Sequence, residues 1–140
     1  YQRLKESETS QKALDWNLSR AISKINYKIH TDAIKENLIP HIVSKKQQTF
    51  TYASEADILN VAMFGITAKE WKEQHPDAIG NIRDSATIQQ LIVLSNMESM
   101  NAELIKQGIT QDQRLSMLNK MAIDQMTSIL GSATTKKLQQ

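Results

Sequence analysis

The chain has 140 residues and no cysteine, and its 17 Lys and Arg residues nearly balance its 15 Asp and Glu residues. This length favours one domain with its own core, and the lack of cysteine excludes disulfides and thiolate metal sites. The small net charge is below that of a dedicated nucleic-acid binder, and no apolar run approaches the ~18 residues of a membrane span. We therefore expect a cytoplasmic protein with no membrane association.

The first predicted helix spans about residues 10–30. Large apolar residues recur in it every three or four positions, which is the spacing of one helical face. They are Leu14, Leu18, Ile22, Ile25 and Ile29. Trp16 and Tyr27 lie on a second face, with Arg20 between them. We expect this helix either to be covered on both sides or to present one face to a partner.

The next segment is the least regular part of the sequence. Thr31 and Asp32 predict the start of a short helix that ends before Pro40. Residues 40–53 lack helical periodicity, and the alternation of polar and aromatic residues over 48–52 predicts a short extended arm.

The rest of the chain predicts further helices with clear starts and stops. Capping-box patterns begin at Ser54 and Thr67, and Asp84 or Ser85 is expected to cap the next helix. The expected ranges are 54–65, 67–76, 84–107 and 110–131, with stops at Gly65, Pro76, Gly108 and Gly131. Two long helices joined by so short a segment predict an antiparallel hairpin.

The fold class that follows is all-α. We expect a compact bundle of five or six helices, dominated by the first helix and the long C-terminal hairpin. A single helical domain would span residues 1–131, and the polar tail over 132–140 would fray.

No residue pattern predicts catalysis, a metal site or a bound cofactor. The only histidines are His30, His41 and His75, and no two of them lie four residues apart on one helix. No nucleophile elbow and no phosphate-binding glycine loop occurs. His30 is expected at a helix end, where the helix dipole favours a positive charge. We therefore predict a non-catalytic protein.

One face of the first helix combines positive and aromatic side chains. Arg20, Lys24 and Lys28 are spaced by four and run beside Trp16 and Tyr27. Basic residues interleaved with aromatic residues suit a partner surface, including one for nucleic acid. The alternative is a solvated face, on which the lysine stems cover packed aromatic rings.

The segment from Gly80 to Asp84 is the second candidate site. Gly80 and Asn81 tolerate a left-handed backbone and predict a sharp turn. In one interpretation Arg83 and its neighbours bind a ligand or partner. In the other the segment is a structural latch, in which Arg83 donates to backbone carbonyls, Ile82 enters the core and Asp84 caps a helix.

Five of the six methionines fall within the predicted C-terminal hairpin. They are Met97, Met100, Met117, Met121 and Met126. Flexible methionines either fill the core of a hairpin or form an adaptable partner-binding surface, and the sequence leaves both interpretations open.

Several strings resemble a known group of proteins. They are YQRLKE (1–6), KINYKIHTDAIKENLI (24–39), ASEADILNVAMFGITAKEW (53–71), GNIRD (80–84) and SNMESMNAELIKQG (95–108). Together they are similar to the region that follows the KilA-N domain in bacterial proteins, especially of Bacteroidetes, and in phage proteins. The resemblance implies a DNA-binding KilA-N module upstream, with residues 1–8 as its last part, and a link to mobile elements.

The resulting prediction is a non-catalytic accessory domain of a KilA-N-type DNA-binding protein. We expect a homo-oligomer, most simply a dimer, that reaches DNA through the upstream module. Two alternatives stay open: an auxiliary nucleic-acid surface on the first helix, and a sensor of a small ligand or host protein with residues 80–84 at its mouth. A pocket beside Arg83 would favour the sensor.

Overall fold

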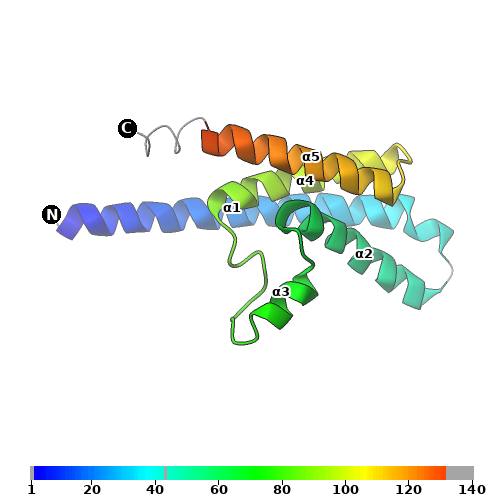
Figure 1. Ribbon diagram of the computed structural model, residues 1–140, viewed down its shortest axis with the longest axis horizontal. Helices are drawn as coiled ribbons and strands as arrows, with labels where there is room; N and C mark the ends of the chain where they lie inside the picture. Colours follow the sequence, from blue (N-terminus) through cyan, green and yellow to red (C-terminus); the bar gives the residue numbers. More distant parts are fainter. Residues whose placement is uncertain (1, 43, 132–140) are drawn as a thin grey trace.

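One long helix and a helical hairpin form the frame of the computed structural model (Figure 1), which describes residues 2–42 and 44–131, with side chains from residue 10. The elements are α1 (Gln2–Asn37), a 3-10 turn η1 (Ile39–His41), α2 (Lys45–Phe64), α3 (Ala68–Gln74), α4 (Ile88–Lys106) and α5 (Gln111–Ile129). No strand occurs in the described part of the chain, which contains five α-helices, so the predicted all-α bundle of five or six helices is confirmed. The expected frayed tail, 132–140, lies outside the described residues.

The long helices pack side by side around one core. α1 lies mainly along α4, α4 and α5 form the predicted hairpin, and α5 also packs on α2 (Figure 1). Buried aliphatic residues of α2, α4 and α5 meet in the centre. They are Ile58, Leu59, Ala62, Val93, Leu94, Met97, Leu104, Leu118 and Ala122. No described helix combines the length and the apolar character needed to cross a membrane.

α1 is longer than predicted, because the expected break at Thr31 does not occur. The Thr31 hydroxyl donates to the backbone carbonyl of Lys28, 3.0 Å away, and so caps nothing. The helix continues to Asn37 and ends before Pro40, which lies in η1. A threonine inside a helix satisfies its hydroxyl in this way, so a cap residue alone did not predict a helix start.

The expected extended arm over residues 48–52 is also wrong, since these residues are helical. α2 begins after Ser44, whose hydroxyl accepts from the backbone N–H of Gln47. Within it, Thr49 and Thr51 donate to carbonyls one turn earlier, so their hydroxyls are satisfied inside the helix. The predicted box at Ser54 therefore falls in the middle of α2.

Two other helix boundaries follow the sequence signals, and one does not. Gly65 ends α2 with φ of 80°, and Thr67 opens α3 with the predicted capping box. The long helix α4 begins not at Asp84 but after Thr87, which forms a capping box with Gln90. Asp84 is used within the preceding loop instead.

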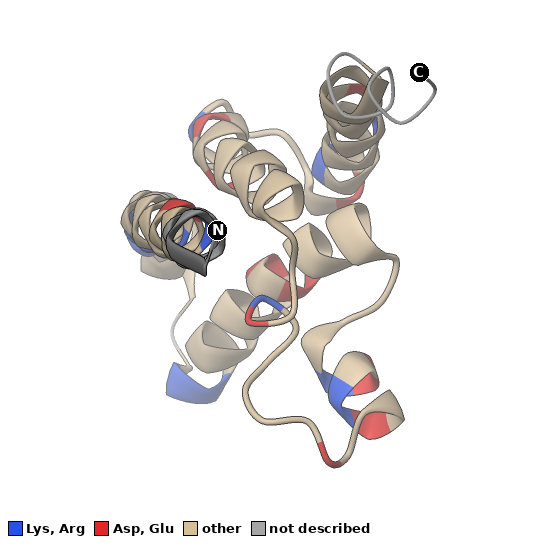
Figure 2. Ribbon diagram, turned by 90° about the vertical axis from the view of Figure 1, so that its left-hand side faces the viewer, with Lys and Arg blue, Asp and Glu red and all other residues tan. Residues whose placement is uncertain are grey.

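The apolar face of α1 is exposed and a partly polar face is buried, although an apolar stripe on a helix usually packs against the core. The stripe Leu14, Leu18, Ile22, Ile25 and Ile29 is exposed, with fractions between 44% and 63%. The face against α4 is partly polar: Ser23 and His30 are buried, and the Asn26 amide donates to the carbonyl of Ser95 at 3.1 Å. Figure 2 shows α1 at the edge of the bundle, with one side free of other helices.

Candidate functional site

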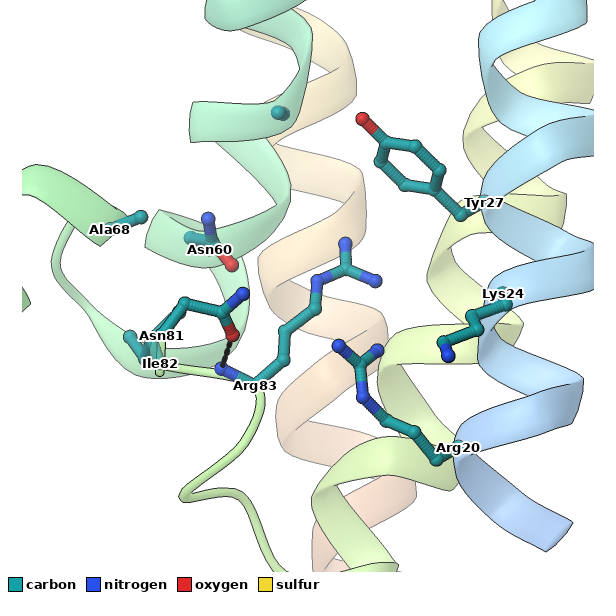
Figure 3. Close-up of a pocket in the computed structure, with 9 residues that line it drawn as sticks. Arg20, Lys24, Tyr27, Asn60, Ala68, Asn81, Ile82 and Arg83 are labelled. Carbon is teal, nitrogen blue, oxygen red and sulfur yellow. Dashed lines mark hydrogen bonds between the residues drawn. The ribbon is translucent and has the colours of Figure 1, made fainter. Parts of the chain in front are cut away.

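A pocket of about 360 Å³ opens between α1, α2 and the loop that precedes α4 (Figure 3). Its lining combines positive, polar and apolar side chains. They are Arg20, Lys24, Tyr27, Ala56, Asn60, Ala68, Asn81, Ile82 and Arg83. The structure thus brings together residues from the two candidate sites, which lie far apart in the sequence. Arg20, Lys24 and Tyr27 come from α1, whereas Asn81 and Arg83 come from the loop.

The loop holds its shape through its own side chains. The backbone N–H of Asn81 donates to Asp84 Oδ2 at 2.9 Å, and that of Arg83 donates to Asn81 Oδ1 at 2.9 Å. Gly80 has φ of 89°, and a Cβ there would lie 2.5 Å from Asp84 Oδ2. Ile82 is buried, as the latch interpretation predicted. Glycine therefore adopts this turn without backbone strain, whereas a side chain at position 80 would have to displace the Asp84 carboxylate.

Arg83 contacts side chains, and not the backbone carbonyls of the latch interpretation. Its Nη1 donates to Glu98 Oε1 at 2.8 Å and lies 3.4 Å from the Ser23 hydroxyl. The guanidinium also lies over the Tyr27 ring, 5.4 Å from the ring centre. The sequence missed this because Glu98 comes from α4, 15 residues away. These contacts hold the side chain of Arg83 in the wall of the pocket (Figure 3).

Glu98 is fully buried and incompletely satisfied. Its Oε2 has no hydrogen-bond partner among the described residues. Burial raises the pKa of Glu98 to about 7, although Arg83, Ser23 and Arg20 oppose the shift. Near neutral pH this carboxyl is therefore only partly ionised, and the positive charge of Arg83 is only partly compensated.

Two other cations lie beside Arg83. Arg20 Nη2 is 3.5 Å from Asp84 Oδ1, which joins α1 to the loop. Lys24 forms no ion pair within the described part of the chain, and Figure 3 shows its side chain directed toward Arg20. The pocket wall is positive, because three cations face two acids, one of them Glu98.

Asn60 completes the polar wall from the side of α2. It is only 6% exposed, and its Oδ1 has no hydrogen-bond partner in the described part of the chain. Figure 3 shows its amide directed into the space next to Asn81 and Arg83. Buried amides without partners are uncommon and call for a bound group or water. The sequence offered no signal for Asn60, which lies within an apolar stretch of α2.

The remaining predicted site residues lie outside the pocket. The Trp16 indole N–H donates to the Ala86 carbonyl at 3.3 Å and ties α1 to the start of α4. Lys28 pairs with Asp32 at 3.1 Å and is largely exposed. The predicted basic stripe is therefore divided: Arg20 and Lys24 face the pocket, and Lys28 does not.

A second buried charge cluster was not predicted at all. Glu55 of α2 and Arg114 of α5 form a two-pronged ion pair, one arm of which joins Arg114 Nη2 to Glu55 Oε2 at 3.0 Å. Asn101 and Gln111 donate to the same carboxylate. A signal existed: Arg114 falls on the apolar stripe of α5 that continues with Leu118, where a solvated arginine has no place.

His30 belongs to this cluster rather than to a helix end. Its Nε2 lies 2.8 Å from Asn101 Nδ2, so the ring accepts through that nitrogen. Burial lowers the pKa of His30 to about 4, with Arg83 and Arg114 adding to the shift and Glu55 opposing it. The expected charged histidine at a helix terminus was therefore wrong.

Within residues 2–42 and 44–131, no three or more His, Asp and Glu side chains are grouped so as to hold a metal ion. The chain matches no known protein family, no curated protein and no solved structure.

Proposed function

We propose that this chain is a non-catalytic helical assembly domain, which dimerises by pairing the exposed apolar stripe of α1 with the same stripe of a second copy. The observation that carries the proposal is the exposure of Leu14, Leu18, Ile22, Ile25 and Ile29, each between 44% and 63%, along one line of a surface helix. Single exposed apolar residues are ordinary, but a contiguous apolar row on a protein surface marks an interaction site.

The spacing of this stripe suits another helix. Leu18, Ile22, Ile25 and Ile29 follow one another at intervals of four, three and four residues. This is the heptad spacing at which two helices interlock their side chains. A second copy of α1 supplies a helix of matching length and pattern.

The charges beside the stripe also favour a second copy. Asp15, Lys28 and Asp32 lie along its edges, and Lys28 already pairs with Asp32. Because both signs are present, two copies of this face do not repel each other. A partner of one strong charge would find no complementary surface there.

The energetics predict a moderate association. Fully burying one Leu or Ile side chain contributes about 1.5–3 kcal/mol, so half-burial of five residues per copy contributes roughly 8–15 kcal/mol. Association costs about 4–15 kcal/mol in lost freedom of motion. The gain and the cost are of similar size, so association of the domain alone should be moderate at most and readily reversible.

The biological role that we propose rests on the resemblance to the region after KilA-N domains. A dimer of this region would hold two DNA-reading modules together. Joining two modules raises their effective affinity without new DNA contacts, and a twofold arrangement suits paired half-sites. The domain itself would touch no base.

The test is the molar mass of the chain in solution. Sedimentation equilibrium over roughly 5–500 μM should show a monomer–dimer equilibrium. The double variant Leu18→Gln, Ile25→Gln should be monomeric throughout, while the monomer keeps its fold because both residues are exposed. Circular dichroism would check the fold.

Ile123→Gln on α5 is the matched control, since Ile123 is also exposed, at 58%, but lies away from α1. It should leave the dimer unchanged. A wild-type chain that stays monomeric at the highest concentration, or a dimer that Ile123→Gln dissociates and the α1 variant does not, would contradict the proposal.

A further inference from the structure

The pocket beside Arg83 has the properties of a binding site for a small molecule, independently of the apolar stripe. Its volume of about 360 Å³ falls at the lower end of the range for small-molecule sites, which is about 300–1,000 Å³. Arg20, Lys24 and Arg83 supply positive charge on one side. Ala68 and Ile82 add an apolar surface. A few polar groups within an otherwise apolar concave surface are typical of ligand pockets.

The charge of the pocket limits the ligand to an anion. Asp84 offsets part of the charge of Arg20, at 3.5 Å. Glu98 offsets part of the charge of Arg83 and is partly protonated near neutral pH. An excess of roughly one to two positive charges remains, which matches the charge of about −1.5 to −2 on a phosphate monoester at pH 7.

The donors of the pocket are already oriented. Arg83 is held by Glu98, 2.8 Å from one of its nitrogens, and its guanidinium carbon lies over the Tyr27 ring, 5.4 Å from the ring centre. A fixed guanidinium loses little freedom when it binds a phosphate through two parallel hydrogen bonds. Lys24 adds an ammonium group to the pocket wall, which suits phosphate as a point charge.

The unpartnered amide oxygen of Asn60 is an independent indication of a ligand. It is buried, lies in the pocket wall, and its Oδ1 has no hydrogen-bond partner within the described residues. An amide there accepts from a ligand hydroxyl or, turned over, donates to a phosphate oxygen. A latch that served structure alone would not need a polar group left open at this depth.

We propose that this pocket binds a small organic phosphate, with the phosphate group between Arg20, Lys24 and Arg83 and the organic body against Tyr27, Ala68 and Ile82. The loop from Gly80 to Asp84, anchored to α4 through Arg83, forms the mouth of the site. The same loop contacts α1 through Asp84, so the ligand would bind where α1, α2 and the loop meet.

The test is a titration of the full 140-residue chain with phenyl phosphate, followed by calorimetry and by amide NMR shifts in low-salt, phosphate-free buffer. A dissociation constant of about 0.1–1 mM is expected for so small a probe. Amide shifts should centre on Lys24, Asn60 and the 80–84 loop. Inorganic phosphate and benzoate should each bind about tenfold more weakly, because one lacks the organic body and the other the second charge.

Two lysines four residues apart give a matched pair of variants. Lys24→Gln should weaken phenyl phosphate binding about fivefold to tenfold, because it removes a cation of the pocket. Lys28→Gln should change binding by less than about twofold, since Lys28 lies outside the pocket and pairs with Asp32. Thermal unfolding would show that both variants fold like the wild type.

Three results would overturn the proposal. They are no binding at about 10 mM probe, equal weakening by the two lysine variants, and amide shifts that map outside the pocket. Benzoate binding as tight as that of phenyl phosphate would overturn the assignment to phosphate. Tighter binding of a single-stranded oligonucleotide that ignores Lys24→Gln would point to a nucleic-acid surface instead.

Discussion

Two buried ion pairs in this bundle both consist of a glutamate and an arginine, but they differ in how completely the carboxylate is hydrogen-bonded. Glu55 with Arg114 and Glu98 with Arg83 each join a buried carboxyl to a guanidinium from a distant segment. In the first pair both carboxylate oxygens accept hydrogen bonds, and Gln111 adds a further donor. In the second pair only one oxygen is engaged, and the arginine borders a pocket.

The difference in hydrogen bonding shifts the pKa values of the two carboxyl groups in opposite directions. Burial alone would raise the pKa of Glu55, but the hydrogen bonds and charge of Arg114, with Gln111 and Asn101, outweigh it, and the pKa lies below its ordinary value. For Glu98 burial prevails and raises the pKa to about 7. The number of donors around a buried carboxyl thus decides whether it forms a permanent ion pair or a group that can respond to its surroundings.

The largest expected effect comes from removing one partner of the closed pair. Arg114→Met leaves Glu55 buried without its cation and also removes a donor to Asn101. We expect a loss of about 3–5 kcal/mol in the free energy of unfolding, measured by urea denaturation at pH 7.

Arg83→Met is the matched change in the open pair. It should cost about 1 kcal/mol or less, because Glu98 can take up a proton once its cation is gone. The contrast between the pairs would be lost if Arg83→Met destabilised the fold as much as Arg114→Met.

The second prediction concerns pH. The pKa of His30 is lowered to about 4, so its contribution to stability is present above its unfolded value near 6.5 and is lost as the pH falls. The pKa of Glu98 is raised to about 7, so its contribution is present at low pH and is lost as the pH rises toward 7. The two effects oppose each other between about pH 4.5 and 6.5.

Glu98→Gln removes one of these opposing effects. Its free energy of unfolding should gain about 2–3 kcal/mol relative to wild type as the pH rises from about 4.5 to 7, measured by urea denaturation at several pH values. Glu103→Gln is the control, because Glu103 is an exposed carboxyl of the same helix and lies outside both buried ion pairs. Curves that stay parallel for Glu98→Gln would show that this carboxyl titrates normally in the fold.

The elements of the fold were largely readable from the sequence, because helix periodicity and capping chemistry are local. The hairpin of α4 and α5, the Thr67 box and the stop at Gly65 followed from neighbouring residues. The errors arose where local signals compete. Thr31 is a residue type that often caps helices, but here it lies inside one. Residues 48–52 alternate between polar and aromatic residues as a strand would, but they are part of helix α2.

The sequence did not predict which face of α1 packs against the bundle. Periodicity shows that a helix has an apolar face, but it does not show what covers that face. Ser23, Asn26 and His30 face α4, and each finds a polar partner there that no pattern along α1 reveals. The sequence predicted part of the pocket. It identified the candidate residues on α1 and in the 80–84 loop, but it did not predict that tertiary packing brings them together. Asn60 and Glu98 became site residues only through that packing.

The smallest expected contrast, a difference of about 1 kcal/mol, separates a glycine of the loop at the pocket from a glycine at an ordinary helix end. Gly80 and Gly65 both have positive φ, 89° and 80°, so alanine strains the backbone at either position. At Gly65 nothing lies within 4 Å of the new Cβ, whereas at Gly80 the Cβ meets Asp84 Oδ2 at 2.5 Å. Gly65→Ala should cost about 1 kcal/mol and Gly80→Ala about 2 kcal/mol in thermal or urea unfolding.

The consequences for the pocket should differ more than the stabilities. A displaced Asp84 releases both the Asn81 backbone and Arg20, so Gly80→Ala should also weaken phenyl phosphate binding, while Gly65→Ala should not. Equal binding by the two variants would mean that the loop holds its turn without Asp84. In that event the orientation of Arg83 would depend on Glu98 and Tyr27 alone, since those contacts come from α4 and α1 and do not involve the turn.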